Sequence, residues 1–345
     1  MIRDILQKLV EGEHLTEQEA VDVMTAVMEG QTTHAQIGAL LAALRAKRET
    51  VDELTGFARV MRAKSVRVYP NRRPLIDTCG TGGDMADTFN ISTAAAFVVA
   101  SAGIAVAKHG NRAVSGRCGS ADVLSALGVE LALTPQQVAD CIDRIGVGFM
   151  FAPHHHPAMQ EVALPRRELG IRTVFNMLGP LTNPAGATRQ LIGVFDPELC
   201  PKLAETLGRL GCERAMVVHG MDGLDEISTI GPTRISLLQN GHVDTDTLVP
   251  ADFNLLPATL EDIHSAPTVE ENAALLRRVL EGEHGPRRDI VAVNAAAGLI
   301  LGGMAEGWRE GVALAHRLLD SGRPAQILQD LIEFTQRCVK DERTF

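Results

Sequence analysis

Apolar side chains recur at helical spacing along residues 1–65. Ile2, Ile5, Leu6 and Leu9 would share one face of a first helix. Three Thr-x-x-Glu/Gln segments follow, at residues 16–19, 33–36 and 50–53. Each predicts a helix start, because the Thr hydroxyl can accept from the N3 amide while the Glu or Gln side chain accepts from the cap amide. We therefore predict an all-helical N-terminal module.

One helix of this module is rich in small residues. Residues 37–44 read Ile-Gly-Ala-Leu-Leu-Ala-Ala-Leu. Such a helix suits close packing. Its alanine-rich face fits a dimer surface, and packing inside one chain explains it equally well.

The pattern changes after a polar, proline-marked joint at residues 70–74. Short apolar runs then alternate with helical segments, which is typical of a parallel α/β sheet. The expected parallel strands are residues 75–78, 104–107, 147–151, 191–195 and 215–219, and a more polar run at residues 233–238 is expected as one antiparallel edge strand.

The predicted fold class is therefore α/β, with a small all-helical N-terminal domain and a large α/β domain built on a mostly parallel central sheet. We expect residues 1–69 to form the helical domain, with residues 162–182 packing into it. Residues 70–161 and 183–345 would form the α/β domain.

Composition narrows the class of protein. The 345 residues carry a formal net charge of -10, and only 3% are aromatic, which disfavours a nucleic-acid partner. The six cysteines form no C-x-x-C pair, so we expect free thiols and neither a zinc site nor disulfides. The longest apolar stretch, residues 93–107, is too short to span a bilayer, and the first ten residues lack a secretion signal. We expect a cytoplasmic protein without a membrane partner.

The glycine-rich and charged motifs follow the expected strands, where α/β sheets bind their ligands. The first strand leads into Gly80-Thr81-Gly82-Gly83-Asp84, whose backbone amides could approach an anion. Residues 90–93, Asn-Ile-Ser-Thr, then precede an Ala-rich helix expected to start near Ala94, and such a helix start favours anions. A tight strand-to-helix turn explains the glycines about as well. The turn is neither a Walker loop nor a dinucleotide-binding turn.

A second motif follows the strand at residues 104–107. Residues 108–122 interleave Lys108, His109, Arg112 and Arg117 with glycines and hydroxyl side chains. This composition is typical of a loop that closes on phosphates, although a charged, solvated loop is the plainer alternative. Ser120 and Asp122 could instead cap the next helix.

Two further clusters carry polar chemistry. His154, His155 and His156 are adjacent, so their side chains diverge, and a lining of a substrate channel is favoured over a metal site. Asp225 and Glu226 follow another strand. Carboxylates near a phosphate site usually hold Mg²⁺, although alone the pair would pass for a polar loop.

Six segments in this order resemble the anthranilate phosphoribosyltransferase family. They are residues 80–84, 90–93, 108–122, 151–159, 170–184 and 222–228. With the helical N-terminus they cover nearly the whole chain, and residues 108–122 and 170–184 are the most specific.

The resemblance implies a homodimer joined through the helical domain and an enzyme of tryptophan biosynthesis. The amine of anthranilate would attack C1 of phosphoribosyl diphosphate, and diphosphate would leave with Mg²⁺, of which two ions per monomer are expected. An aromatic amine is uncharged at neutral pH, so positioning and electrostatics suffice. We expect no covalent intermediate and no indispensable base, with Lys108, Asn111 and Arg166 as the positioning and electrostatic groups.

Site residues follow from the resemblance in three sets. Phosphoribosyl diphosphate would contact Gly80, Gly83, Asp84, Thr88, Asn90, Ile91, Ser92, Thr93, Lys108, His109, Gly110, Asn111, Arg112, Ala113, Val114, Ser115, Gly116 and Ser120. Anthranilate would contact Gly80, His109, Asn111, Pro153, His156, Arg166 and Gly179, and magnesium would be held by Ser92, Asp225 and Glu226. The planar guanidinium of Arg166 suits a carboxylate.

The chain departs from the family pattern in two places. Cys118 stands where the family often has Ser, which puts a hydroxyl contact there in doubt. Leu164 and Pro165 precede Arg166 where the family commonly has Pro and then a small apolar residue, which could shift the backbone entering the Arg166 helix.

Two alternatives share the fold. A pyrimidine nucleoside phosphorylase would use inorganic phosphate and a nucleoside, and residues 108–116 and 170–184 argue against it. A non-enzymatic, nucleic-acid-binding relative would need a basic groove and would have lost Asp225 and Glu226. A glutamine amidotransferase partner, if one exists, would be a separate chain.

Overall fold

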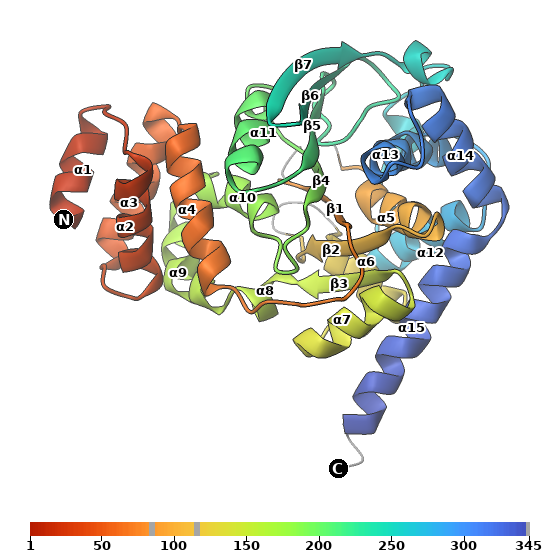
Figure 1. Ribbon diagram of the computed structural model, residues 1–345, viewed down its shortest axis with the longest axis horizontal. Helices are drawn as coiled ribbons and strands as arrows, with labels where there is room; N and C mark the ends of the chain where they lie inside the picture. Colours follow the sequence, from red (N-terminus) through yellow and green to blue (C-terminus); the bar gives the residue numbers. More distant parts are fainter. Residues whose placement is uncertain (83–86, 114–117, 343–345) are drawn as a thin grey trace.

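The structure, a computed structural model, describes residues 1–82, 87–113 and 118–342. The N-terminal segment forms four helices: α1 (Ile2–Val10), α2 (Glu17–Met28), α3 (His34–Lys47) and α4 (Val51–Lys64). The capping boxes of Thr16, Thr33 and Thr50 are all present. The prediction of an all-helical N-terminal module is confirmed (Figure 1).

A seven-stranded sheet with the order β3-β2-β1-β4-β5-β6-β7 forms the centre of the larger part. The strands are β1 (Leu75–Gly80), β2 (Ala105–Gly110), β3 (Val147–Phe151), β4 (Arg189–Gly193), β5 (Arg214–Gly220), β6 (Thr233–Gln239) and β7 (His242–Leu248). β1 to β5 pair in parallel, and β6 and β7 continue the sheet antiparallel.

The edge of the sheet differs from the prediction. The run at residues 233–238 is antiparallel, as expected, but it is not the edge strand. β7 covers it, and most side chains of β7 are exposed. This strand, His-Val-Asp-Thr-Asp-Thr-Leu, has no apolar run that would reveal it in sequence, because both of its faces are mostly polar.

Fifteen α-helices and four short 3₁₀ helices are assigned in the described residues. The remaining helices are α5 (Ile91–Ser101), α6 (Ser120–Ala126), α7 (Pro135–Arg144), α8 (Ala152–His155), η1 (Pro157–Met159), α9 (Gln160–Leu169), α10 (Val174–Leu178), η2 (Pro180–Thr182), α11 (Leu199–Arg209), η3 (Pro250–Phe253), η4 (Glu261–Ile263), α12 (Val269–Leu280), α13 (Pro286–Gly302), α14 (Trp308–Asp320) and α15 (Arg323–Glu342).

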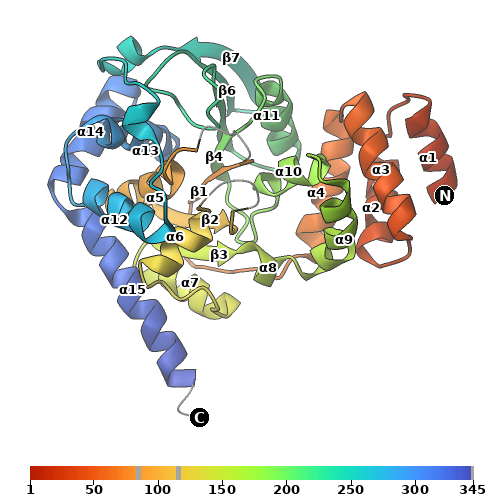
Figure 2. The ribbon, with the colours of Figure 1, turned by 180° about the vertical axis from the view of Figure 1, so that it is seen from behind.

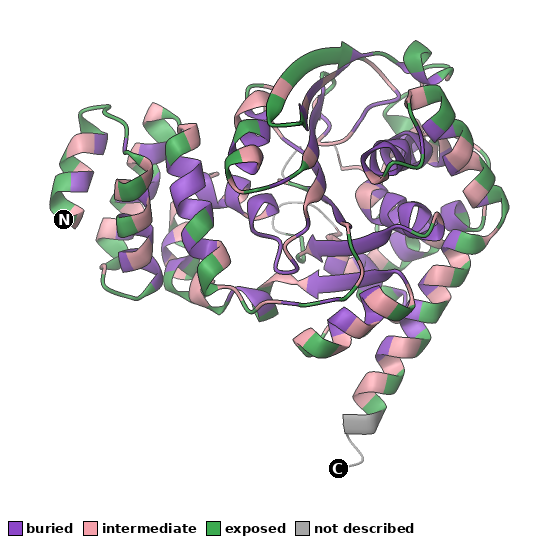
Figure 3. Ribbon diagram, viewed as in Figure 1, coloured by how far each residue is buried: buried purple, intermediate pink, exposed green. Residues whose placement is uncertain are grey.

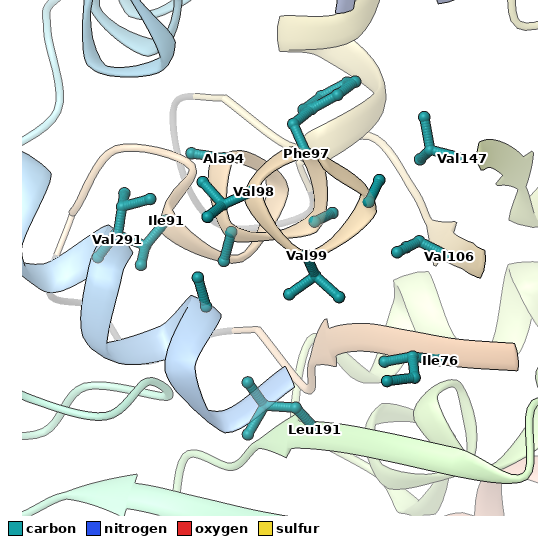
Figure 4. Close-up of a cluster of buried hydrophobic side chains, with 14 of the residues drawn as sticks. Ile76, Ile91, Ala94, Phe97, Val98, Val99, Val106, Val147, Leu191 and Val291 are labelled. Atoms are coloured by element: carbon teal, nitrogen blue, oxygen red, sulfur yellow. The ribbon is translucent and has the colours of Figure 1, made fainter. Parts of the chain in front are cut away.

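The sheet separates two hydrophobic cores, because successive side chains of a strand point to opposite faces. On β5, Met216 and Val218 join the core built with α5 and α13, while Ala215 and Val217 join the core that continues into the helical bundle. Figure 4 shows the first core around α5, and Figure 3 shows that α5 and α13 are buried almost throughout.

Helices from the middle of the chain lie beside the N-terminal bundle. α9 contacts α2 and α3, and α10 contacts α3 and α4. Both views place α10 between α4 and the sheet, whereas α9 lies against the bundle (Figures 1 and 2). The division into domains, with residues 162–182 assigned to the helical one and a boundary between residues 69 and 70, stays a prediction.

Candidate active site

Four of the parallel strands have a glycine as their last residue, at the carboxyl ends of the strands. β1, β2, β4 and β5 end at Gly80, Gly110, Gly193 and Gly220. A Cβ on Gly193 would lie 1.5 Å from the backbone oxygen of Asp225, and one on Gly80 would lie 2.5 Å from Asp225 Oδ2. Because these strand ends carry no side chain, the loop after β5 that contains Asp225 and Glu226, called the acidic loop below, can approach β1 and β4.

The glycine-rich turn is anchored to this acidic loop. The Gly82 amide donates to Asp225 Oδ2 at 2.9 Å, and the Thr81 amide donates to the Gly193 carbonyl at 2.9 Å. Gly82 has a φ of 65°, in the left-handed region that favours glycine. The predicted contacts Gly83 and Asp84 lie outside the described residues.

The N-terminus of α5 faces the same loop. The helix begins at Ile91, three residues earlier than the sequence suggested. The Ser92 amide donates to Glu226 Oε1 at 3.1 Å. Asn90 does not cap the helix with its side chain; its Nδ2 donates to the Cys118 carbonyl at 3.0 Å. Thr93 is buried within this first turn.

Lys108 reaches from the end of β2 toward the start of α5. It is 3% exposed, and its Nζ donates to the Thr78 carbonyl and lies 3.4 Å from Ser92 Oγ. Burial lowers the pKa of Lys108, and the negative charge of Asp77 opposes that shift. The side chain of Lys108 is thus buried between the end of β1 and the start of α5.

A buried carboxylate that the sequence analysis did not select holds this region together. Asp77 Oδ1 accepts from the His109 amide at 3.1 Å, and Asp77 Oδ2 accepts from Asn183 Nδ2 at 2.7 Å. Asn183 also donates to the Ala107 carbonyl at 2.9 Å. Burial raises the pKa of Asp77, against the effect of Lys108 and of these hydrogen bonds. An aspartate inside the apolar run Leu-Ile-Asp-Thr was the available signal.

Two predicted histidines come together beside this network. The ring centroids of His109 and His156 lie 5.1 Å apart, and both side chains are buried. Burial, followed by the neighbouring histidines, lowers the pKa of His109, and a hydrogen bond with the Gly179 backbone opposes this. Burial lowers the pKa of His156 to about 4. At neutral pH both rings are therefore uncharged.

Arg166 lies on α9, next to Pro165 inside the helix. Its guanidinium lies over the Phe175 ring, 5.3 Å from the centroid. Phe175 belongs to α10, the helix that leads to Gly179, and the Gly179 backbone makes a hydrogen bond with His109. Burial lowers the pKa of Arg166. Pro153, on α8, is exposed.

Asp122 binds both described ends of the loop after β2. Its carboxylate accepts from the amides of Ala113 at 2.9 Å and Gly119 at 3.0 Å, and it pairs with Arg112 at 2.8 Å. Burial acts to raise the pKa of Asp122, but these contacts outweigh it and the pKa is lowered.

The described ends of this loop also meet each other. The carbonyl of Asn111 accepts from the Ala121 amide and the Ser120 hydroxyl, at 3.2 and 3.3 Å. A Cβ on Gly110 would lie 2.2 Å from Ser120 Oγ, so this predicted contact residue has no room for a side chain. The predicted contacts Val114, Ser115 and Gly116 lie outside the described residues.

The donor chemistry fits magnesium. Ser92, Asp225 and Glu226 offer oxygen atoms only, and hydrogen bonds tie α5, the glycine turn and the acidic loop together. Mg²⁺ prefers such oxygens and usually binds one or two carboxylates together with waters and phosphate oxygens. Among the described residues, no group of three or more His, Cys, Asp or Glu side chains is arranged for a metal. The three consecutive histidines form no such site.

Two family models match the chain. The glycosyl transferase family a/b domain matches residues 72–325, and the glycosyl transferase family helical bundle domain matches residues 3–65. A protein of Pelotomaculum thermopropionicum named anthranilate phosphoribosyltransferase is 55% identical over 335 residues, which cover 97% of each chain. The chain belongs to the anthranilate phosphoribosyltransferase family. A protein of Acetivibrio thermocellus with the same name is 51% identical over 335 residues, again 97% of each chain.

Solved structures of this family have the same fold. The anthranilate phosphoribosyltransferase of Thermus thermophilus is 46% identical and superposes with a TM-score of 0.91, over 96% of this chain and 99% of that one. The enzyme of Saccharomyces cerevisiae, in complex with phosphoribosyl diphosphate and Mg, is 28% identical with a TM-score of 0.88, over 97% and 98% of the two chains.

Family membership confirms the predicted fold class and the prediction of a glycosyltransferase-type enzyme. It decides against the nucleoside phosphorylase and nucleic-acid-binding alternatives, because the relatives at this identity are named for the transferase. In the part of the chain that the structure describes, no helix has the length and apolar character needed to cross a bilayer. In the described residues, no cysteine is joined to another in a disulfide.

Proposed function

We propose that this chain transfers the phosphoribosyl group of 5-phosphoribosyl 1-diphosphate to the amine of anthranilate, a step of tryptophan biosynthesis. The proposal rests on one observation: the glycine turn after β1, the start of α5 and the acidic loop after β5 contact one another at the carboxyl ends of the parallel strands. The amides of Gly82 and Ser92 donate to the adjacent carboxylates of Asp225 and Glu226. Lys108 Nζ lies 3.4 Å from Ser92 Oγ.

The sugar diphosphate would lie along the carboxyl ends of these strands. The positive end of the α5 dipole, at Ile91 and the residues that follow it, favours phosphate oxygens. Lys108 adds a buried positive charge, which is stronger in a low-dielectric setting than in water. The proposed contacts among the described residues are Gly80, Thr88, Asn90, Ile91, Ser92, Thr93, Lys108, His109, Gly110, Asn111, Arg112, Ala113 and Ser120.

Magnesium would be held by Ser92, Asp225 and Glu226, and we propose two ions per monomer. When bound, the metal neutralises charge that develops on the departing diphosphate. The residues themselves set the geometry: the Gly82 amide orients the Asp225 carboxylate, and the Ser92 amide orients that of Glu226.

Anthranilate would lie on the side of His109, His156 and Arg166, with Gly80, Asn111, Pro153 and Gly179 at its border. The neutral histidine rings give an uncharged wall for an aromatic ring. Arg166 offers a planar pair of donors to the carboxylate, and its stacking on Phe175 limits its freedom before binding.

The reaction then needs little from the protein in covalent terms. The bond from C1 to the diphosphate oxygen breaks with its electron pair, and the amine nitrogen forms the new bond to C1. The proton that the amine loses passes to solvent or to diphosphate. Holding amine and C1 in line and stabilising the leaving charge supply most of the rate enhancement.

A homodimer through the helical domain and a cytoplasmic location are part of the proposal. Ala35, Ala39, Ala42 and Ala46 form an exposed stripe on α3, and helices can approach closely across small residues. Light scattering should give the mass of a dimer for the native chain and that of a monomer for Ala39→Glu. A monomeric native chain would contradict this part.

The test of the activity is fluorescence detection of phosphoribosyl anthranilate, with and without Mg²⁺. We expect turnover that needs both substrates and the metal. Phosphorolysis of thymidine, without turnover of anthranilate and phosphoribosyl diphosphate, would overturn the proposal.

A further inference from the structure

The chain between β1 and α5 is held at both ends. Its first end is anchored to Gly193 and Asp225 through the amides of Thr81 and Gly82. Its second end, residues 87–89, pairs with a segment far along the chain, residues 263–265, which none of the site motifs contains.

Ser265 makes two hydrogen bonds with Asp87. Its amide donates to the Asp87 carbonyl at 2.8 Å, and its hydroxyl donates to Asp87 Oδ1 at 2.9 Å. In the next two residues, Thr88 forms an antiparallel bridge with His264, and the Phe89 amide donates to the Ile263 carbonyl at 3.4 Å. Three consecutive residues of each segment therefore contact the other.

The partner segment is itself fixed in the body of the protein. Ile263 is fully buried in the core. Arg287, at the start of α13, donates to the His264 carbonyl at 3.2 Å. Asn272 of α12 exchanges two hydrogen bonds with the backbone of Ala266, both at 2.9 Å. Residues 263–265 can therefore serve as a fixed support for residues 87–89.

Asp87 needs such a support. Its φ is 50°, in the left-handed region that few residues other than glycine occupy. Aspartate is among the residues that tolerate this region best. A hydrogen bond at the side chain and another at the backbone favour this conformation over an extended one, and the direction in which the chain leaves Asp87 places Thr88 and the start of α5.

We infer that Ser265 is a positioning residue for the sugar-diphosphate site, which it serves by holding Asp87 and so fixing Thr88 and the first turn of α5. This inference rests on the proposed function, because it takes Thr88 and residues 90–93 as the side that contacts phosphoribosyl diphosphate. Ser265 acts through Asp87 and does not itself contact the substrate.

The main test is Ser265→Ala, which removes the 2.9 Å hydrogen bond and leaves the backbone contact. Loss of a hydrogen bond to a carboxylate predicts a rise of about tenfold in the KM for phosphoribosyl diphosphate. The KM for anthranilate, the kcat at saturation and the melting temperature should stay close to those of the native chain. Equal rises in both KM values, or no rise, would overturn the inference.

Two sets of variants sharpen the result. Ser321→Ala is the matched control, because the Ser321 hydroxyl makes a similar hydrogen bond to the Leu318 carbonyl at the exposed end of α14; it should change neither KM. Asp87→Asn keeps an oxygen acceptor and tolerates the positive φ, so it should stay near the native KM. Asp87→Ala should match or exceed the defect of Ser265→Ala, and combining the two should add little.

Calorimetric titration with phosphoribosyl diphosphate and Mg²⁺ separates this inference from the proposed function. If the native chain does not bind the sugar diphosphate, the proposed function fails. If the native chain and Ser265→Ala bind it equally well, the positioning role alone fails. Weaker binding by Ser265→Ala at unchanged melting temperature supports both.

Discussion

Asp225 and Gly193 meet so closely that no side chain could stand between them. A Cβ on Gly193 would lie 1.5 Å from the Asp225 carbonyl oxygen, while the Asp225 carboxylate accepts the Gly82 amide at 2.9 Å. The glycine at the end of β4 therefore allows the acidic loop to reach the glycine turn after β1. In this arrangement the group proposed to hold magnesium and the group proposed to hold diphosphate form a single unit.

Replacing Asp225 and Glu226 together by Ala should abolish Mg²⁺-dependent turnover. The change removes both carboxylates of the proposed metal set and leaves the amides of Gly82 and Ser92 without their acceptors. The measurement is the rate of phosphoribosyl anthranilate formation across a magnesium titration. Asp244→Ala, on the exposed edge strand β7, is the control for loss of acidic charge. A near-native rate in the double variant would remove the pair from the site.

Replacing Arg166 by Ala should raise the KM for anthranilate more than that for phosphoribosyl diphosphate. Loss of a paired hydrogen bond to a carboxylate predicts a rise on the order of tenfold to a hundredfold. Arg167→Ala, at the next and exposed position of α9, is the control. Because Arg166 also covers Phe175, melting temperatures should be compared. Equal effects on both KM values would argue against a carboxylate contact.

The fold was predictable from the sequence in segments where a single local pattern indicates the type of element. Helix starts followed from the capping boxes at Thr16, Thr33 and Thr50, and the buried parallel strands followed from their apolar runs. β7 was not predicted, because both of its faces are mostly polar. Its strand conformation depends on backbone hydrogen bonds with β6, which a local pattern does not show.

The candidate site was predicted through motifs that are local in the chain. Asp77 and Ser265 lie outside them, because their roles depend on partners far away in sequence. Asn183 is 106 positions from Asp77, and Asp87 is 178 positions from Ser265. The pairing of His109 with His156 likewise depends on β2 and β3 lying side by side. No spacing rule in one sequence reveals such contacts.

Acid should destabilise the fold through His156. Burial lowers its pKa from an ordinary 6.5 to about 4, so between these values the unfolded chain binds a proton that the folded chain does not. Stability from this group is therefore complete above pH 6.5 and falls as the pH drops toward 4, by up to about 3 kcal/mol. Urea unfolding at pH 7.5 and pH 5 measures this loss.

A glutamine at position 156 removes the titrating group. His156→Gln should reduce the difference in unfolding free energy between the two pH values, while His154→Gln, at an exposed position, should leave it as in the native chain. The same pH dependence in all three proteins would show that another group causes the acid sensitivity.

Asp77 should be needed both for stability and for the arrangement of the site. Asp77→Ala would leave the His109 amide without its acceptor and Asn183 Nδ2 with one acceptor fewer. It would also remove the negative charge that most raises the pKa of Lys108. Breaking a buried charged network of this kind costs about 3 to 5 kcal/mol, which urea unfolding would detect.

Asp77→Asn separates the two roles. It keeps the shape and one acceptor oxygen, so it should lose less stability than Asp77→Ala. It should still lower kcat markedly. The reason is that Asp77 connects the end of β2, which carries Lys108 and His109, to Asn183. Adding Asn183→Asp restores one complementary pair across the 2.7 Å contact and should recover part of the lost stability. If the double variant is no more stable than the sum of its single changes predicts, Asp77 and Asn183 are not coupled, and the network is not what holds these strands in place.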